Sequence, residues 1–318
     1  MDLQMAASAG VVPDFLRDAD PATIAISSAD GAAIQPLAIT PVRHNLDRHP
    51  LLQLPRLRQL AESLAGTDHI KLSMPKRKEG SAFYTLSEQE AKTTVHEVFD
   101  QIESPGSWIA IYYAEADSQY RALLDQTLRQ LAPQIEANDP GMYGFNMFIF
   151  IAAPPTVTPF HIDRENNLNL QIAGRKRWRI WRPEDSVAVP REAVEEYFVR
   201  DSLRKLRYTP DLDARALHVE VGPGEGIHFP ATCAHTVTTE TDWVQPGNAV
   251  AVSVAMTYFT QDTRRRANVT VANDFLRHHL PGGAVGEGAV LDHLKYPLAR
   301  ALIGSRQLLR RTAPPRGT

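Results

Sequence analysis

The chain has 318 residues, 43% of them hydrophobic and 22% charged, with a formal net charge of -3. This composition is typical of a globular protein and excludes a disordered one. The near balance of charge favours neither nucleic acid nor an anionic membrane as a partner. The single cysteine, Cys233, excludes an intrachain disulfide and a Cys-rich zinc module and favours a reducing, cytoplasmic location. The sequence has no signal-peptide pattern and no apolar run of about 18 residues, so it predicts no membrane segment.

Helical patterns dominate the first third of the chain, after an irregular lead-in of about forty residues. The spacing of apolar residues predicts a helix over 55–64. Ser87 and Glu90 fit a capping box that begins a second helix over 87–103. A third helix is predicted over 120–131, where leucines recur at helical intervals.

Strand patterns begin between these helices and dominate to about residue 259. Dense β-branched and aromatic residues predict strands over 108–113, 145–153 and 249–259. Residues 168–172 and 176–181 each alternate apolar and polar side chains, and the Ala-Gly-Arg sequence between them can turn. These two segments together predict a β-hairpin.

Two further helices are predicted near the C-terminus, over 264–280 and 291–311. From Lys295 onward the chain carries six basic residues and no acidic ones, but a leucine stripe there favours packing or a homodimer over an acidic partner. Helices, then strands, then helices predict a mainly β fold, an antiparallel barrel or sandwich with helices outside it. The predicted segments are a helical extension over 1–105, a core over 106–262 and C-terminal helices over 263–318.

A His-x-Asp sequence in the strand-rich region is the main candidate for chemistry. Residues two apart on a strand project to the same face, so His161 and Asp163 can bind one metal ion. His235, on a distant strand, would complete a two-His, one-carboxylate triad, which leaves coordination positions open and is typical of non-haem Fe(II) oxygenases. By itself the spacing is common, and packed or surface histidines are the alternative.

The surroundings of these residues extend the pattern. The segments TPFHIDRENNLNLQIAGRKRWRIWRP and PGEGIHFPATCAHTV closely resemble the cupin-like JmjC group of Fe(II)- and 2-oxoglutarate-dependent oxygenases, which includes the asparaginyl hydroxylase acting on hypoxia-inducible factor. The segments RHNLDRHPLLQLPRLRQLAESL and RRRANVTVANDFLR also look like bacterial cupin-like proteins, some labelled transcriptional regulators. This resemblance implies a double-stranded β-helix, or jelly-roll, core flanked by N- and C-terminal helices.

The resemblance also implies roles for individual residues. It makes His161, Asp163 and His235 the ligands of Fe(II). It makes Lys176 the cation that pairs with the distal carboxylate of 2-oxoglutarate, because a buried carboxylate needs such a partner. By charge alone, the neighbouring arginines on either side of Lys176 could do the same.

Two more positions match the pattern less directly. Thr158 would donate a hydrogen bond to the distal carboxylate, and Asn167 would contact the cosubstrate or its neighbours. Thr158 precedes His161 by three residues and would face away from the site in a regular strand, so its role requires a bulge near Pro159. Gln171 also matches the family pattern, but it could equally be a polar residue of the hairpin with no role in the site.

The chemistry implied by the resemblance is oxidation by O2 coupled to decarboxylation of 2-oxoglutarate. Succinate and CO2 would be released as a peptide or protein side chain or a small metabolite is hydroxylated. A non-catalytic cupin-like binding or transcriptional regulatory protein is the main alternative. A non-redox cupin, such as a metal-dependent sugar isomerase, is the third.

Other residues near the motif have structural interpretations. His228 could supplement the metal ligands, but we expect it to line the pocket or bond to a neighbour. Tyr112 and Tyr113 could reach the cosubstrate or belong to the core. The basic and aromatic residues over 175–182 could contact nucleic acid, but strand alternation predicts one cosubstrate contact and a solvated face. We expect Cys233 to be buried and inert.

Overall fold

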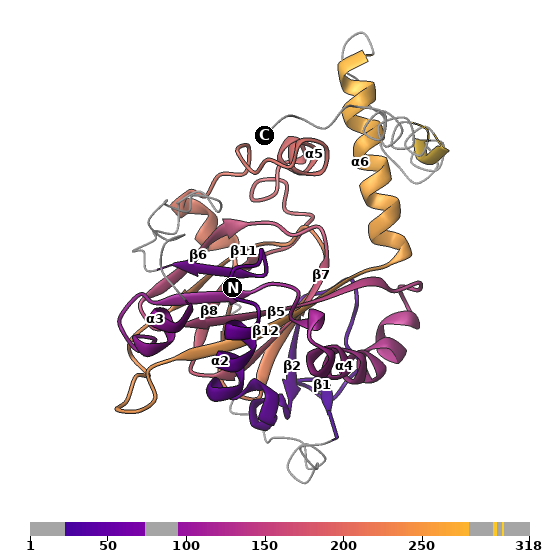
Figure 1. The fold of residues 1–318 in the computed structure, drawn as a ribbon. Helices are drawn as coiled ribbons and strands as arrows, with labels where there is room; N and C mark the ends of the chain where they lie inside the picture. Colours follow the sequence, from indigo (N-terminus) through magenta and orange to yellow (C-terminus); the bar gives the residue numbers. More distant parts are fainter. Residues whose placement is uncertain (1–22, 74–94, 280–294, 298–300, 302–318) are drawn as a thin grey trace.

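The computed structural model describes residues 23–73, 95–279, 295–297 and 301, and its centre is a sandwich of two antiparallel sheets (Figure 1). The large sheet has the order β1 (Ile26–Ser28), β2 (Thr40–His44), β10 (Glu225–Phe229), β7 (Asn166–Ala173), β12 (Ala251–Phe259), β5 (Tyr143–Ala152), β4 (Trp108–Ile111) and β3 (Ile70–Ser73). The small sheet has the order β6 (Thr156–His161), β11 (Ala234–Thr239), β8 (Lys176–Trp181) and β9 (Leu217–Val221). The strands predicted over 108–113, 145–153 and 249–259 are confirmed as β4, β5 and β12.

Eight consecutive strands form the jelly roll that the sequence predicted. β5, β7, β10 and β12 are neighbours in the large sheet, and β6, β8, β9 and β11 make the whole small sheet. The chain therefore crosses repeatedly between the two sheets, which is the topology of a double-stranded β-helix. The crossing places residues from distant parts of the sequence on the facing inner surfaces.

The hairpin predicted across 173–175 is wrong. β7 pairs with β10 and β12, whereas β8 pairs with β9 and β11, so the turn carries the chain from one sheet to the other. Gly174 has a φ of +66°, and a Cβ there would lie 2.9 Å from the Cα of Ala251. Period-2 alternation identifies a strand but does not identify its partner, which is why the local pattern was misleading.

Helices surround the sandwich, and the larger ones match the predictions. They are α2 (Leu54–Ser63), α3 (Val95–Asp100), α4 (Ser118–Glu136), α5 (Arg191–Arg200) and α6 (Gln261–His279), with short 3-10 turns at Leu46–Arg48, Pro50–Leu52, Ala114–Ala116 and Pro210–Arg215. α2, α4 and α6 confirm the helices predicted over 55–64, 120–131 and 264–280. α5 was not predicted. None of the described helices has the length and hydropathy needed to cross a bilayer.

Two predicted helices lie partly or mostly outside the described residues. α3 covers the end of the helix predicted over 87–103, and its proposed capping residues Ser87 and Glu90 lie outside them. The same holds for most of the helix predicted over 291–311. The segment before residue 105, predicted as helical, also contributes β1, β2 and β3 to the large sheet. The three segment boundaries stay a prediction.

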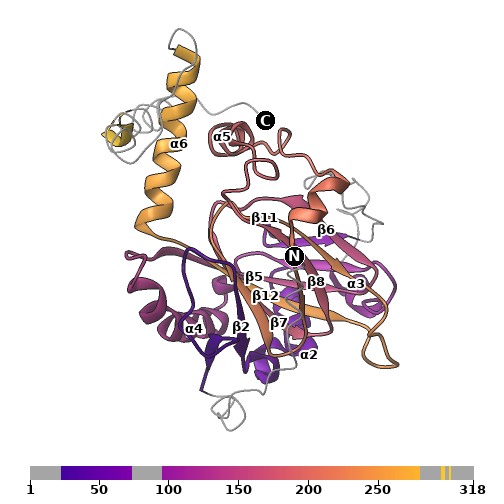
Figure 2. The same ribbon diagram turned by 180° about the vertical axis from the view of Figure 1, so that it is seen from behind.

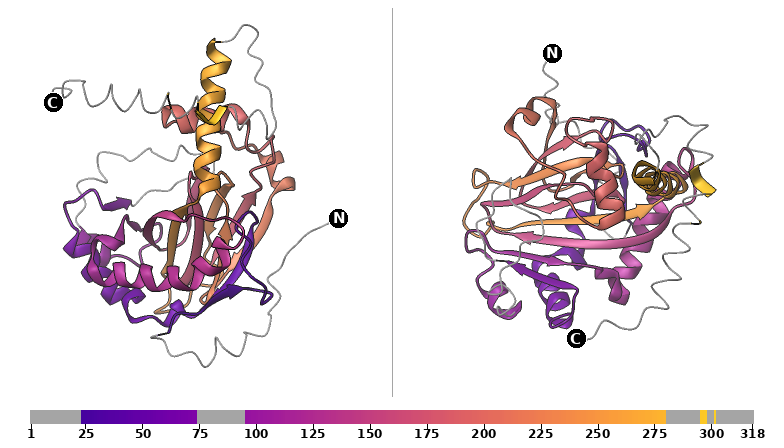
Figure 3. Two further views of the ribbon diagram at one scale, coloured as in Figure 1. Left: turned by 90° about the vertical axis from the view of Figure 1, so that its right-hand side faces the viewer. Right: turned by 90° about the horizontal axis from the view of Figure 1, so that it is seen from above.

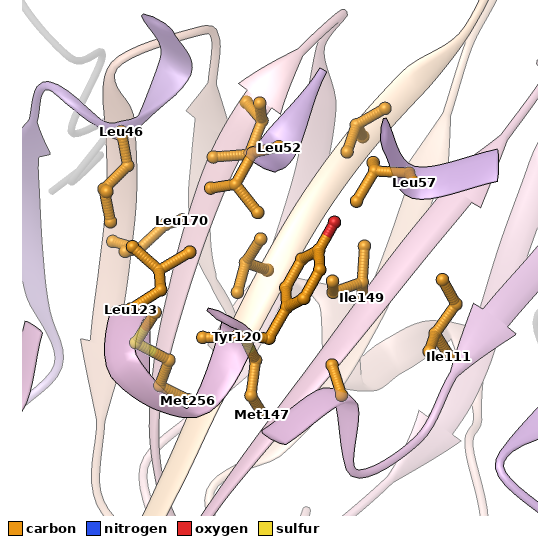
Figure 4. Packing of buried hydrophobic residues seen from close by; sticks show 14 of the residues in the cluster. Leu46, Leu52, Leu57, Ile111, Tyr120, Leu123, Met147, Ile149, Leu170 and Met256 are labelled. Atoms are coloured by element: carbon orange, nitrogen blue, oxygen red, sulfur yellow. The ribbon is translucent and has the colours of Figure 1, made fainter. Parts of the chain in front are cut away.

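The largest apolar cluster lies on the outer face of the large sheet, under α2 and α4 (Figure 4). Leu168 and Leu170 of β7 and Met256 of β12 point into it, because alternate residues of each strand share this face. Tyr120 of α4 lies in the same cluster, and its hydroxyl donates to the carbonyl of Leu51 over 2.7 Å. The remaining residues of these strands therefore face the small sheet.

α5 and α6 lie together at one end of the sandwich, where α6 rises from the end of β12 (Figures 1, 2 and 3). Arg277 of α6 pairs with the buried Glu195 of α5 over 3.1 Å. Arg200 of α5 pairs with the buried Asp274 of α6 over 2.9 Å. These ion pairs attach α6 to α5 by specific contacts, since the buried carboxylates need cationic partners.

Candidate metal centre

The three predicted metal ligands converge between the sheets. His161 ends β6 and lies directly opposite His235 of β11, while Asp163 follows His161 by two residues. One ligand atom from each residue lies within 4.8 Å of the other two. The Nε2 atoms of His161 and His235 lie 3.6 and 3.7 Å from the Asp163 carboxylate oxygens. Both imidazoles are buried, whereas the Asp163 side chain is 26% exposed, so the cluster opens at the carboxylate.

Backbone carbonyls fix the tautomer of both histidines. His161 Nδ1 lies 2.8 Å from the carbonyl of Pro159, and His235 Nδ1 lies 3.0 Å from that of Cys233. A carbonyl can only accept a hydrogen bond, so each Nδ1 carries a proton and each Nε2 is the ring nitrogen directed at Asp163. Burial lowers the pKa of His235 to about 4, which keeps this imidazole neutral. A neutral imidazole with its proton on Nδ1 binds a metal ion through Nε2.

A pair of hydrogen bonds connects the two ligand-bearing loops. The Thr232 amide donates to the carbonyl of Asp163 itself, over 2.9 Å. The Ala231 amide donates to the Asn166 side-chain oxygen, also over 2.9 Å, and this contact is buried. Thr232 adopts a φ of +66°, which a β-branched residue rarely does. The loop before His235 is therefore held in a specific conformation against the loop that carries Asp163.

Asn166→Ala is expected to weaken metal binding by about 10-fold, because it removes the side chain that aligns these loops without removing a ligand. Anaerobic titration of the purified variant with Co(II), followed by its absorption bands, measures the affinity. Asn248→Ala, in the exposed bridge between Gln245 and Asn248, is the control and should bind Co(II) as the wild type does. Equal affinity in the Asn166 variant would contradict the positioning role.

Lys176 lies on the inner face of β8 and is buried. Its Nζ donates to the Ser253 hydroxyl over 2.6 Å and lies 5.8 Å from the centroid of the Phe150 ring. Among the described residues, no carboxylate pairs with this ammonium group. Desolvation therefore lowers the pKa of Lys176 to about 7. A buried cation with one neutral partner is suited to binding an incoming anion.

The bulge required at Thr158 is present. Between the pairs His161–His235 and Thr158–Val237, β6 has one residue more than β11. In a regular strand, residues three apart point to opposite faces. The extra residue of the bulge changes this, so that Thr158 points to the inner face. Thr158 therefore shares the face of His161 despite its odd spacing.

Asn167 and Gln171 lie on the inner face of β7, as shown by their register with Thr257 and Ser253 of β12. The Asn167 amide donates to the Asp163 carboxylate over 3.4 Å. The Gln171 side-chain amide donates to the carbonyl of Ala173, two residues further along the chain, over 2.6 Å. Asn167 thus lies beside the candidate ligand Asp163, and its contact with the cosubstrate stays a prediction. For Gln171, the sequence did not distinguish the inner face from a polar position in a hairpin.

Several buried polar atoms on these inner faces have no hydrogen-bond partner among the described residues. They are Asn167 Oδ1, Gln171 Oε1, Thr257 Oγ1 and Trp178 Nε1. Unsatisfied buried polar atoms are uncommon in folded proteins and suggest a ligand or water that completes them. Together with the convergent His-Asp-His set and the buried ammonium, they fit a divalent cation and a small polar anion bound beside it.

The other sequence candidates lie outside this cluster. His228 projects to the outer face of the large sheet, in register with Leu168, and its Nε2 lies 2.8 Å from the Tyr258 hydroxyl. One of its ring nitrogens is therefore bonded to a neighbour, and because the ring lies on the outer face it does not face the cluster of His161, Asp163 and His235. Burial lowers the pKa of His228 to about 4. Cys233 is buried, and burial raises the pKa of its thiol, as expected for an inert cysteine.

The tyrosines and arginines near the motif divide between faces. The Tyr112 ring lies 6.4 Å from that of Phe150, which itself adjoins Lys176, whereas Tyr113 is 47% exposed. Arg175 and Arg177 both pair with Glu220 on the outer side of the small sheet, at 3.2 and 2.8 Å. Lys176 thus points inward and these two arginines lie on the opposite face, as strand alternation predicted; the cosubstrate contact of Lys176 stays a prediction.

Two inner-face residues escaped the sequence reasoning. The Ser253 hydroxyl accepts a hydrogen bond from Lys176. Trp178 lies on β8 between Lys176 and Ile180, the residue that pairs with His235. The alternation of small or polar residues with larger apolar ones along β12 was the available signal for Ser253. It did not say which distant strand this face would oppose.

Comparison with known proteins places the chain among related sequences. It is 31% identical over 139 residues to HSPB1-associated protein 1 homolog of Danio rerio, a match that covers 40% of this chain and 30% of that relative. Solved structures of the Escherichia coli protein YcfD cover 92% of this chain with a TM-score of 0.40. One of these structures is 12% identical to this chain, which covers 68% of the YcfD chain. Another, described as a ribosomal oxygenase in complex with cobalt and 2-oxoglutarate, is 14% identical, and this chain covers 66% of it.

The profile of the cupin-like domain matches residues 55–264, which is more than half of the chain. The matched range contains the whole jelly roll and all three residues of the metal cluster. The chain therefore belongs to the cupin-like domain family.

Proposed function

We propose that the protein is an Fe(II)- and 2-oxoglutarate-dependent oxygenase that hydroxylates a peptide or protein side chain or a small metabolite. The convergence of His161, Asp163 and His235 on the inner face, with the buried ammonium of Lys176 on the same face, carries the proposal. Two imidazoles and one carboxylate bind Fe(II) from one side and leave adjacent positions open. A pure binding scaffold needs neither the ligand set nor the buried cation.

Each residue has a role that follows from its position. His161 and His235 bind through Nε2, and Asp163 supplies the negative charge that a divalent ion favours. Lys176, supported by Ser253, holds the distal carboxylate of 2-oxoglutarate. When bound, Fe(II) would couple decarboxylation of 2-oxoglutarate to succinate and CO2 with insertion of one oxygen atom of O2 into a C–H bond.

The inner faces also shield this chemistry from water. Trp178, Phe229 and Val237 form one buried apolar cluster between the sheets. Asp163 is the partly exposed member of the triad, so a substrate would approach from its side. Apolar packing beside the histidines keeps bulk water away from them, which limits side reactions of the oxidant.

Succinate formation tests the proposal. Purified protein with Fe(II), 2-oxoglutarate and O2 is expected to release succinate, and anaerobic addition of 2-oxoglutarate to the Fe(II) form should give a metal-to-ligand absorption band. No band together with salt-dependent DNA binding would favour the transcriptional alternative. Metal binding without the band would favour a non-redox cupin.

The homodimer and the cytoplasmic location remain predictions. The buried, reduced Cys233 and the absence of a membrane-spanning helix among the described residues are compatible with the cytoplasm.

A further inference from the structure

Trp178 occupies the part of β8 between the candidate metal ligands and Lys176. Lys176, Trp178 and Ile180 alternate onto the inner face of this strand, and Ile180 lies directly opposite His235. Residues two apart on a strand are separated by about 7 Å. A small molecule that reaches from His235 to the Lys176 ammonium along β8 would therefore lie over the part of the strand that carries Trp178.

The indole of Trp178 is packed but its N–H group has no partner. The side chain is 4% exposed, and its Nε1 is buried without a hydrogen-bond partner among the described residues. The ring stacks near His235, with centroids 5.7 Å apart and planes at 29°, and it contacts Phe229 with centroids 5.8 Å apart. A buried donor left unpaired in this position is suited to an acceptor that arrives with a ligand.

Trp181 on the same strand provides the contrast. It projects to the outer face, into the cluster with Phe160, and its Nε1 donates to the carbonyl of Leu212 over 2.8 Å. The two tryptophans differ in the satisfaction of the indole N–H and in the face that they occupy. Trp181 is accordingly structural, and it is a matched control for Trp178.

We infer that the Trp178 indole N–H donates a hydrogen bond to bound 2-oxoglutarate and so forms a third point of recognition, between the metal and Lys176. This inference rests on the proposed function, because it requires the ketoacid to span those two groups. An oxygen of the ketoacid is the acceptor, and a negative charge on it strengthens the bond.

Trp178→Phe tests the inference, because it keeps an aromatic ring and removes the donor. The variant is expected to bind 2-oxoglutarate about 10-fold more weakly, with Co(II) affinity unchanged, since a hydrogen bond to a charged acceptor contributes about that factor or more. Trp181→Phe should retain wild-type affinity for 2-oxoglutarate. Equal affinity of wild type and Trp178→Phe would overturn the inference and leave the proposed function intact.

A second measurement uses the unaltered chain. The protein has 4 tryptophans, so indole-¹⁵N labelling gives a small set of N–H signals. In the diamagnetic Zn(II) form, 2-oxoglutarate should shift the Trp178 signal and protect it from exchange, while the Trp181 signal stays in place. An unchanged Trp178 signal in protein that has bound 2-oxoglutarate would overturn the inference. Wild-type protein that binds no 2-oxoglutarate would overturn both proposals.

Discussion

His161→Ala and Asp163→Ala are expected to lower succinate formation at least about 100-fold, because each removes one of three metal ligands. Two ligands do not hold Fe(II) in the open, one-sided geometry that the reaction needs. The Asp163 carboxylate also provides the negative charge of the ligand set, so Asp163→Asn should lose most of the activity although its shape is conserved. Succinate release and Co(II) affinity measured on the same preparations check both effects.

His218→Ala is the control for these variants. His218 is exposed on β9, and its ring contacts only the backbone carbonyl of Asp213 among the hydrogen bonds described, over 3.3 Å. The variant should bind Co(II) and form succinate as the wild type does. Equal turnover in wild type, His161→Ala and Asp163→Ala would show that this cluster does not bind the active metal.

Binding of 2-oxoglutarate is expected to weaken as the pH rises above about 7, because Lys176 then loses its proton. Burial lowers the pKa of Lys176 to about 7, so the free protein holds this side chain largely neutral at alkaline pH. A bound carboxylate favours the ammonium form and raises the pKa again. Above about pH 7, binding must therefore take up a proton, and affinity should fall by up to about 10-fold per pH unit.

The lowered pKa of Lys176 also determines whether the free protein becomes more or less stable as the pH changes. The folded pKa of Lys176 lies below the unfolded value, so the folded state binds fewer protons between the two values. Stability is then highest above the unfolded pKa and decreases as the pH falls toward about 7. Binding of the ketoacid should reduce this dependence, because the bound carboxylate raises the pKa of Lys176 back toward its unfolded value.

Lys176→Arg separates this effect from other ionisations. The guanidinium stays charged throughout, so the affinity of the variant should be nearly constant between about pH 7 and about pH 9, whatever its absolute value. Lys176→Met should lower the affinity about 100-fold with Co(II) binding unchanged, because one partner of a buried charge pair is lost. Titrations across this pH range, with calorimetry in two buffers to count protons, measure both. Parallel pH profiles for wild type and Lys176→Arg would refute the role of Lys176.

Local pattern was sufficient for the elements that carry the chemistry. Period-2 alternation identified β7 and β8 as strands, dense β-branched and aromatic residues identified β12, and helical spacing identified α2, α4 and α6. The His-x-Asp spacing predicted two residues of one strand, whereas β6 ends at His161 and Asp163 lies in the loop that follows; the odd spacing of Thr158 correctly required a bulge. These features depend on the geometry of one strand or one helix, which neighbouring residues determine.

The sequence by itself thus determined a mainly β fold, and its resemblance to a family gave the jelly-roll class, the candidate ligands and the candidate partner Lys176. The tertiary structure alone decided that β7 and β8 belong to different sheets, that His235 faces inward while His228 faces Tyr258, and that Ser253 and Trp178 lie beside Lys176. The physical reason is that strand pairing joins residues far apart in the chain. Which face each strand presents depends on that long-range register, because a shift of one residue reverses every side chain.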